Sequence, residues 1–188
     1  MEGFLFMLRL FKYSGYGVDV EPEALMLSPF KEIWDRDSSP DKIIAKQELA
    51  FLYFMGDPRS DYQYIIDEKE RIKEIKKGEG MPSNWKPDRV VKHALEFYNS
   101  FKPASAGLLE DTRAVVDKLR NLLKKINLDE RDDKGKPVHT IASITATIKQ
   151  IPGLVKDLDE AEKTLAKDII SEAKARGSQD KGVFEDDE

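Results

Sequence analysis

Cysteine is absent from the 188-residue chain. The protein therefore forms no disulfide, no cysteine-ligated zinc site and no thiol nucleophile, and this composition fits a reducing compartment. Histidine is almost as scarce, since only His93 and His139 occur. Neither has a second histidine at the spacing of a zinc-protease motif, so we expect both to be structural side chains.

Long apolar runs and a basic excess are lacking as well. The N-terminal residues 1–11 are apolar enough to test as a signal peptide, but Glu2 stands where basic residues belong and Arg9 interrupts the run. No segment approaches the roughly 20 apolar residues that cross a bilayer, so we expect no membrane association. The net charge of −5, without a basic stripe, argues against a protein that grips DNA through its phosphates.

Motifs for catalysis or ligand binding are missing too. The run from Asp35 to Asp41 alternates like the first half of a calcium loop, but Pro40 and Lys46 stand where that loop requires glycine and glutamate. Two Gly-x-Gly turns, at 15–17 and 78–80, lack the pattern of phosphate-binding loops. The sequence predicts no enzyme activity, no cofactor and no metal site.

Signals for helices are abundant. Hydrophobic residues make up 40% and charged residues 36% of the chain, a composition typical of amphipathic helices with solvated outer faces. Helices are predicted over residues 28–37, 40–55, 61–77, 87–100 and 104–127. The second of these is apolar almost all round in its latter half, so we expect it at the centre of the fold.

The two ends of the chain carry different patterns. The apolar run 3–12 and the alternating residues 18–20 predict a small hairpin or extended element. Apolar residues recur every three or four positions over 138–176, interrupted at Pro152, which predicts two more helical stretches. The last residues are acidic, with five acids and one lysine from 180 to 188, and are expected to order only on a partner.

These patterns define the expected fold class and division of the chain. The fold class is mainly α: a helical bundle of about six or seven helices, with a short N-terminal β element and an extended acidic C-terminal tail. The expected parts are an N-terminal extended or β arm (1–27), a helical core domain (28–128), a C-terminal helical hairpin-like segment (129–176) and an acidic tail (177–188).

The stretches FKEIWDRD (30–37) and ELAFLYFM (48–55), with GVDVEPEALML (17–27) before them, resemble virion proteins of tailed bacteriophages, those of crAss-like phages in particular. The resemblance covers roughly residues 15–100 and contains no catalytic motif. It implies a portal adaptor or neck-ring protein, made in the host cytoplasm and located in the neck or tail region of the virion. Such a protein forms a twelve-fold ring with itself, contacts the portal protein and other neck or tail rings, and extends the channel for passing DNA without sequence-specific binding.

Seven apolar residues are candidates for binding partners: Phe4, Phe6, Trp85, Leu158, Leu165, Val183 and Phe184. They represent the N-terminal segment, a Pro-rich loop, the striped C-terminal helices and the tail. The tryptophan in the Pro-rich loop either plugs its own domain or anchors a partner. Two functions stay open: a phage neck structural protein, or a cytosolic helical binding module, such as an assembly chaperone or regulatory factor, that is absent from the mature particle.

Overall fold

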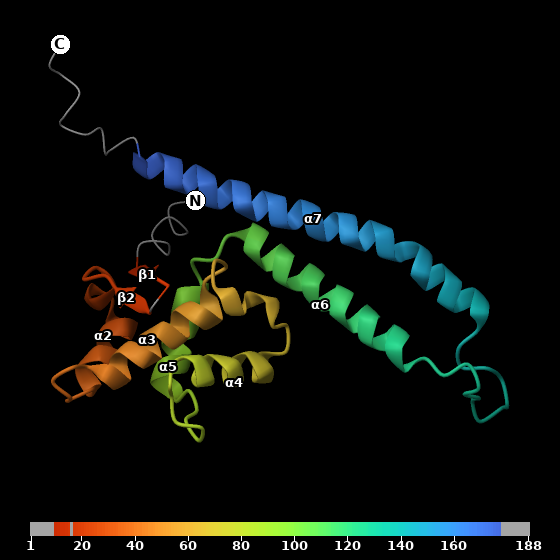
Figure 1. Cartoon of the computed structure of the whole chain (residues 1–188), viewed down its shortest axis with the longest axis horizontal. Coiled ribbons are helices and arrows are strands. Elements are labelled where there is room, and N and C mark those ends of the chain that lie inside the picture. The colour runs from red at the N-terminus through yellow and green to blue at the C-terminus, as the bar shows by residue number, and fades with distance from the viewer. Residues whose placement is uncertain (1–9, 16, 178–188) are drawn as a thin grey trace, which may run out of the picture. The chain divides into compact units, whose positions relative to one another are not determined.

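The computed structural model describes residues 10–15 and 17–177, with side chains described as far as Ser171. Within these ranges the protein is mainly α-helical, with six α-helices and one two-stranded antiparallel sheet near the N-terminus (Figure 1). The predicted fold class is confirmed. The chain divides into two compact units, of which unit 1 ends at Pro103 and unit 2 begins at Ala104.

The sheet of unit 1 is a hairpin of β1 (Phe11–Tyr13) and β2 (Val18–Val20), in which Phe11 lies opposite Val20. Gly15, with a φ of 83°, sits in the turn between the strands, where a positive φ favours glycine. The ring of Phe11 is fully buried and packs edge-on against Phe30 and Tyr98. The hairpin is thereby fixed to the helices. Its second strand confirms the prediction from the alternating residues 18–20.

Four α-helices and two 3₁₀ turns complete unit 1. Their bounds are η1 (Ala24–Met26), α2 (Ser28–Arg36), α3 (Ile43–Gly56), η2 (Asp61–Tyr64), α4 (Glu68–Gly78) and α5 (Arg89–Asn99). Helix α3 contacts α2, α4, α5 and β2, and every residue from Glu48 to Asp57 is buried. Its central position confirms the prediction from its all-round apolar surface.

Helix α3 begins at Ile43, three residues later than predicted. The Asp37 carboxylate accepts hydrogen bonds from the backbone N–H groups of Ser39 (2.9 Å) and Ala45 (3.0 Å). Lys42, just before the helix, has the left-handed φ of 51°. Because Asp37 holds the intervening turn, the chain enters the helix only after Lys42.

The predicted helix 61–77 is divided in two by its caps. Ser60 caps the 3₁₀ turn η2 by accepting a hydrogen bond from the Tyr62 N–H at 3.2 Å. Asp67 caps α4 by accepting one from the Glu70 N–H at 2.8 Å. Each cap satisfies backbone donors at the start of its own helix, so the segment forms two elements instead of one.

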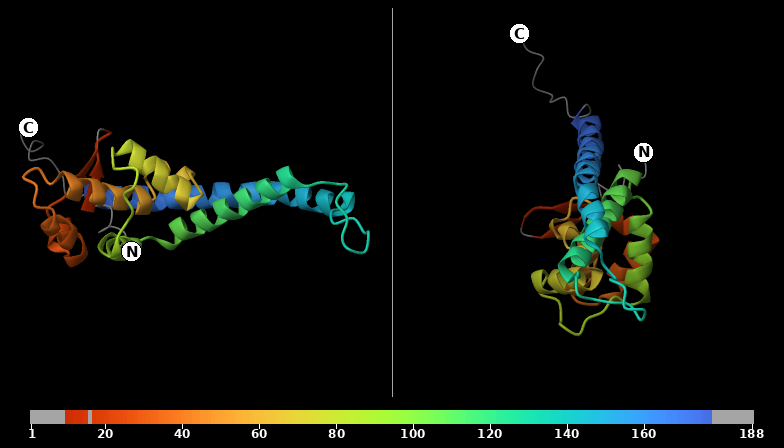
Figure 2. Two further views of the ribbon diagram at one scale, coloured as in Figure 1. Left: turned by 90° about the horizontal axis from the view of Figure 1, so that it is seen from below. Right: turned by 90° about the vertical axis from the view of Figure 1, so that its right-hand side faces the viewer.

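Unit 2 is a hairpin of two long helices, α6 (Ala104–Lys125) and α7 (Ile141–Gly177), that lie alongside each other (Figure 2). Its buried cluster joins the start of α6 to the latter half of α7 and consists of Ala106, Leu109, Ala161 and Leu165. The helices are therefore antiparallel.

Two details of unit 2 differ from the prediction. Pro152 lies inside α7 instead of ending a helix, because neighbouring turns and packing on α6 carry the helix past the one backbone hydrogen bond that proline removes. Helix α6 was predicted to belong to the core domain 28–128, and residues 129–176 to form a hairpin by themselves. In the structure the hairpin is α6 with α7, since the apolar residues of α6 pack on α7.

Candidate interaction surfaces

The most deeply buried charge in unit 1 is Asp57, at the C-terminal end of α3. Its Oδ1 accepts hydrogen bonds from the Arg59 N–H (2.8 Å) and Nε (2.9 Å). Its Oδ2 accepts from the Arg59 Nη2 (2.7 Å) and the Tyr98 hydroxyl (2.8 Å). Both carboxylate oxygens are satisfied and the charge is paired, which is what a buried carboxylate requires. The group therefore ties α3 to α5 and offers no open position to a substrate.

Two tyrosines border this cluster. Burial, followed by the charge of Asp57, raises the pKa of Tyr53 to about 12. The same two causes raise the pKa of Tyr98 well above its usual value. The Arg59 guanidinium also lies 5.8 Å from the centre of the Tyr53 ring, a distance typical of a cation–π contact. Both tyrosines stay protonated at neutral pH and act as hydrogen-bonding and packing groups.

A second network, in which Glu48 is the buried charge, surrounds the half-buried Trp85. Arg36 pairs through Nη2 with Glu48 (2.5 Å) and through Nη1 with Asp88 (2.6 Å). The indole Nε1 of Trp85 donates to Glu48 at 3.3 Å, and its ring packs edge-on against Phe51 with centroids 4.9 Å apart. Of the two roles considered for Trp85, its placement is that of a plug on its own domain.

Leu158 and Leu165, predicted to contact partners, lie instead against α6. Leu165 belongs to the buried cluster of unit 2, and Leu158 packs against that cluster from the same helix. The stripe that suggested an interface is thus used inside the hairpin. The other candidates, Phe4, Phe6, Val183 and Phe184, lie outside the described residues.

Unit 2 exposes two different rows of apolar side chains, which we name the α6 stripe and the α7 stripe. The α6 stripe is Leu108, Val115 and Leu122; the α7 stripe is Ile141, Ile148 and Val155. These six side chains are between 49% and 75% exposed. Within each stripe the residues are seven positions apart, so they line one side of their helix. The sequence predicted apolar residues at helical spacing along both helices. Spacing alone does not separate the exposed rows from the buried set, because Leu158 and Leu165 are seven positions apart as well.

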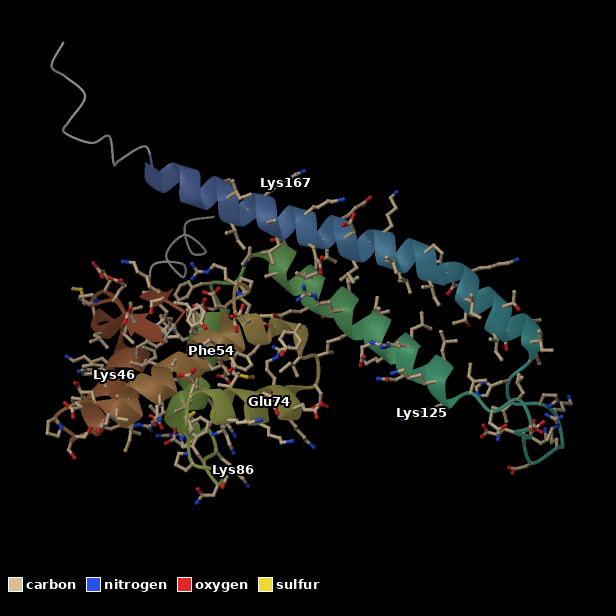
Figure 3. The ribbon with its side chains drawn as sticks, in the orientation of Figure 1. Lys46, Phe54, Glu74, Lys86, Lys125 and Lys167 are labelled. Atoms are coloured by element: carbon tan, nitrogen blue, oxygen red, sulfur yellow. The ribbon has the colours of Figure 1, made fainter. Side chains whose placement is uncertain are left out.

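Two grooves run between the helices, each beside one stripe. Side chains project along the whole length of both helices (Figure 3). The first, of about 500 Å³, is lined by Leu108 and Val115 together with the acidic Asp111 and Asp157. We call it the acidic groove. It places carboxylates at the rim of an apolar surface.

The second groove, of about 370 Å³, is lined by Val155 of the α7 stripe and by apolar residues of both helices, together with Arg120 and Lys124. We call it the basic groove. Unit 2 therefore presents apolar surface bordered by acids in one place and by bases in another.

Sites for metal chemistry are not found in the described part of the chain. Between residues 10 and 177, leaving out 16, no cluster of three or more His, Asp or Glu side chains is placed to hold a metal ion. His93 is exposed and His139 is half-buried. No helix among the described residues is both long and apolar enough to cross a membrane.

Comparison with known proteins gives no further assignment. No family model matches the chain, and no curated protein or solved structure matches it. The resemblance of residues 15–100 to phage virion proteins stays a prediction. The exposed stripes and the two grooves of unit 2 are the features of the described residues that point to a function.

Proposed function

We propose that the protein is a structural, non-enzymatic component of a tailed-phage virion: a portal adaptor or neck protein that forms a ring in the head-to-tail connector. The observation that supports this most is the open hairpin of unit 2, with two half-exposed apolar stripes. Exposed apolar rows of this kind, bordered by charges, mark protein–protein contact surfaces.

The unequal construction of the two units supports the same role. Unit 1 has a packed core with fully paired buried charges at Asp57 and Glu48, so it folds as a rigid body. In unit 2 the described buried cluster is confined to four residues, two on each helix. A hairpin this long with so small a core is stabilised by neighbours, as in an assembly of subunits.

The resemblance of residues 15–100 narrows the assembly to the phage neck. In that position the ring binds the portal protein at one end and other neck or tail proteins at the other, while DNA passes through. The net charge of −5 suits a channel wall, because like charge keeps phosphates from adhering.

The alternative is a cytosolic helical binding module, such as an assembly chaperone, that leaves before the particle matures. The basic groove is the observation that favours this alternative. An apolar groove between two helices can bind the apolar face of a helix from a client protein. The two functions differ in where the protein ends up.

Mass spectrometry of purified virions separates them. A connector ring is expected in amounts equal to the portal protein, and it stays with the particle through gradient purification. The major capsid protein and the phage-encoded DNA polymerase serve as markers for virion and non-virion proteins. Absence of the chain from purified virions, with abundance in the infected-cell lysate, would overturn the connector proposal and support the chaperone.

A further inference from the structure

The two stripes of unit 2 are alike in length and in spacing. We propose that the α6 stripe of one copy packs against the α7 stripe of the next copy, head to tail, so that the hairpins form the continuous wall of the ring. This inference rests on the proposed function for the ring itself. The identity of the occupant, a second copy of this chain, is argued from the hairpin alone.

Length and spacing are matched between the stripes. Each runs over two heptads, from Leu108 to Leu122 and from Ile141 to Val155, or about 21 Å of helix at ~1.5 Å per residue. In α7 the intervening apolar residues Ile144 and Ile151 fill the pattern of threes and fours. Two helices with this spacing interlock as knobs into holes along their length.

The stripes point to different sides of the hairpin. Val155 and Asp157 are two residues apart on α7, and at ~100° per residue they lie about 200° apart around the helix axis. Asp157 borders the acidic groove with Leu108 and Val115, so the α7 stripe faces away from the α6 stripe. One copy therefore contacts two neighbours at once through unlike surfaces. Such contacts generate rings when the rotation closes.

Charge favours the unlike pairing over the like one. Asp111 and Asp157 lie beside the α6 stripe, and Arg120 and Lys124 lie beside the α7 stripe. Packing the first surface on the second brings acids to bases. A two-fold dimer through either surface alone brings like charges together, which costs affinity and register. The charges thus select a head-to-tail neighbour.

The absence of cysteine makes a cross-linking test direct. Full-length V115C and I148C carry single thiols at the midpoints of the two stripes, where they meet whichever direction the helices run. We expect oxidation of the mixture to give a disulfide-linked dimer, and the double variant V115C/I148C to give a ladder of higher multimers. N121C, on the exposed far side of α6, replaces V115C in the control mixture and is expected to give only background.

Both mixtures are oxidised with the chain alone and with the portal protein present, so that a ring that assembles only on the portal is also captured. Cross-linking no stronger than the N121C control in both conditions would overturn the inference. So would equally strong linkage of V115C to itself, which would indicate a two-fold dimer.

Charge exchange supplies a second measurement that leaves the stripes intact. D111K/D157K is expected to lose multimers in sedimentation, and adding R120E/K124E to the same chain should restore them. No restoration would count against the pairing. If the protein is present in virions but neither cross-linking nor charge exchange supports the pairing, the connector function stands and this interface is wrong. If both experiments support the pairing but the protein is absent from virions, the protein self-assembles in another role.

Discussion

The buried carboxylate of Asp57 gives the sharpest stability prediction. Asp57→Asn keeps the shape but removes the charge, and one of its two acceptors becomes an N–H₂ group that faces the donors of Arg59 or Tyr98. Breaking a buried ion pair by removing one partner costs about 3–5 kcal/mol. Since the Arg59 side chain is 28% exposed and can be rehydrated, we expect a loss near the lower limit, about 3 kcal/mol.

Tyr98→Phe is the matched control because it deletes a single donor to the same carboxylate. A hydrogen bond to a charged group contributes about 1.5–3 kcal/mol, and the three remaining Arg59 donors place this loss at the low end. The double variant should lose less than the sum of the two, since both single changes remove the same hydrogen bond.

Urea unfolding followed by tryptophan fluorescence measures these losses. Both tryptophans of the chain, Trp34 and Trp85, belong to unit 1, so the signal reports the unit that contains Asp57. If Asp57→Asn cost no more than Tyr98→Phe, the carboxylate would not be the group that ties α3 to α5, and the reasoning from its four hydrogen bonds would be refuted.

Three further changes test the packing. Gly56→Ala should destabilise unit 1 by about 1–3 kcal/mol, because a Cβ there lies 2.6 Å from Cδ1 of the buried Tyr98; the urea midpoint measures it. Pro152→Ala should raise the helicity and thermal midpoint of unit 2, by up to about 3 kcal/mol, in circular dichroism; an unchanged melt would show that proline costs α7 nothing. Backbone N–H groups of Ala45 and Ser39 lower the pKa of Asp37 from 3.8 to about 2. The stabilisation by the Asp37 carboxylate is therefore complete above pH 4 and lost as the pH falls towards 2. The difference in urea midpoint between Asp37→Asn and the unchanged protein should shrink over the same pH range.

Local signals in the sequence were enough for much of unit 1. The all-round apolar surface of residues 49–55 predicted the buried centre, and Pro29 in the first turn of α2 agrees with the predicted start. The alternation at 18–20 predicted the second strand of the hairpin. These features depend on side chains a few positions apart, which a sequence displays directly.

Contacts between residues far apart in the sequence could not be predicted from such local patterns. Asp57 meets Tyr98 across 41 positions, and no spacing rule links them. The start of α3 depends on Asp37 reaching Ala45 across a turn. Pro152 and Gly153 predict a break in the helix, yet Pro152 stands inside α7, because packing on α6 decides the outcome.

The candidate surfaces of α6 and α7 could be predicted only in part, for a related reason. Periodicity showed that α6 and α7 carry apolar residues at helical spacing, but it does not say which of two adjacent stripes a neighbouring helix covers. The structure assigns Leu158 and Leu165 to the hairpin and leaves Val115 and Ile148 exposed. The sequence therefore predicted the apolar rows of α6 and α7, but not which side chains the hairpin buries and which it leaves exposed.

Electron microscopy of the full chain mixed with the portal protein of the same phage tests the central claim most directly. The account predicts a ring stacked coaxially on the portal, with the portal's twelve-fold symmetry and with helical hairpins side by side in its wall. A chain that stays monomeric and leaves the portal undecorated, at concentrations where both proteins are folded, would contradict it.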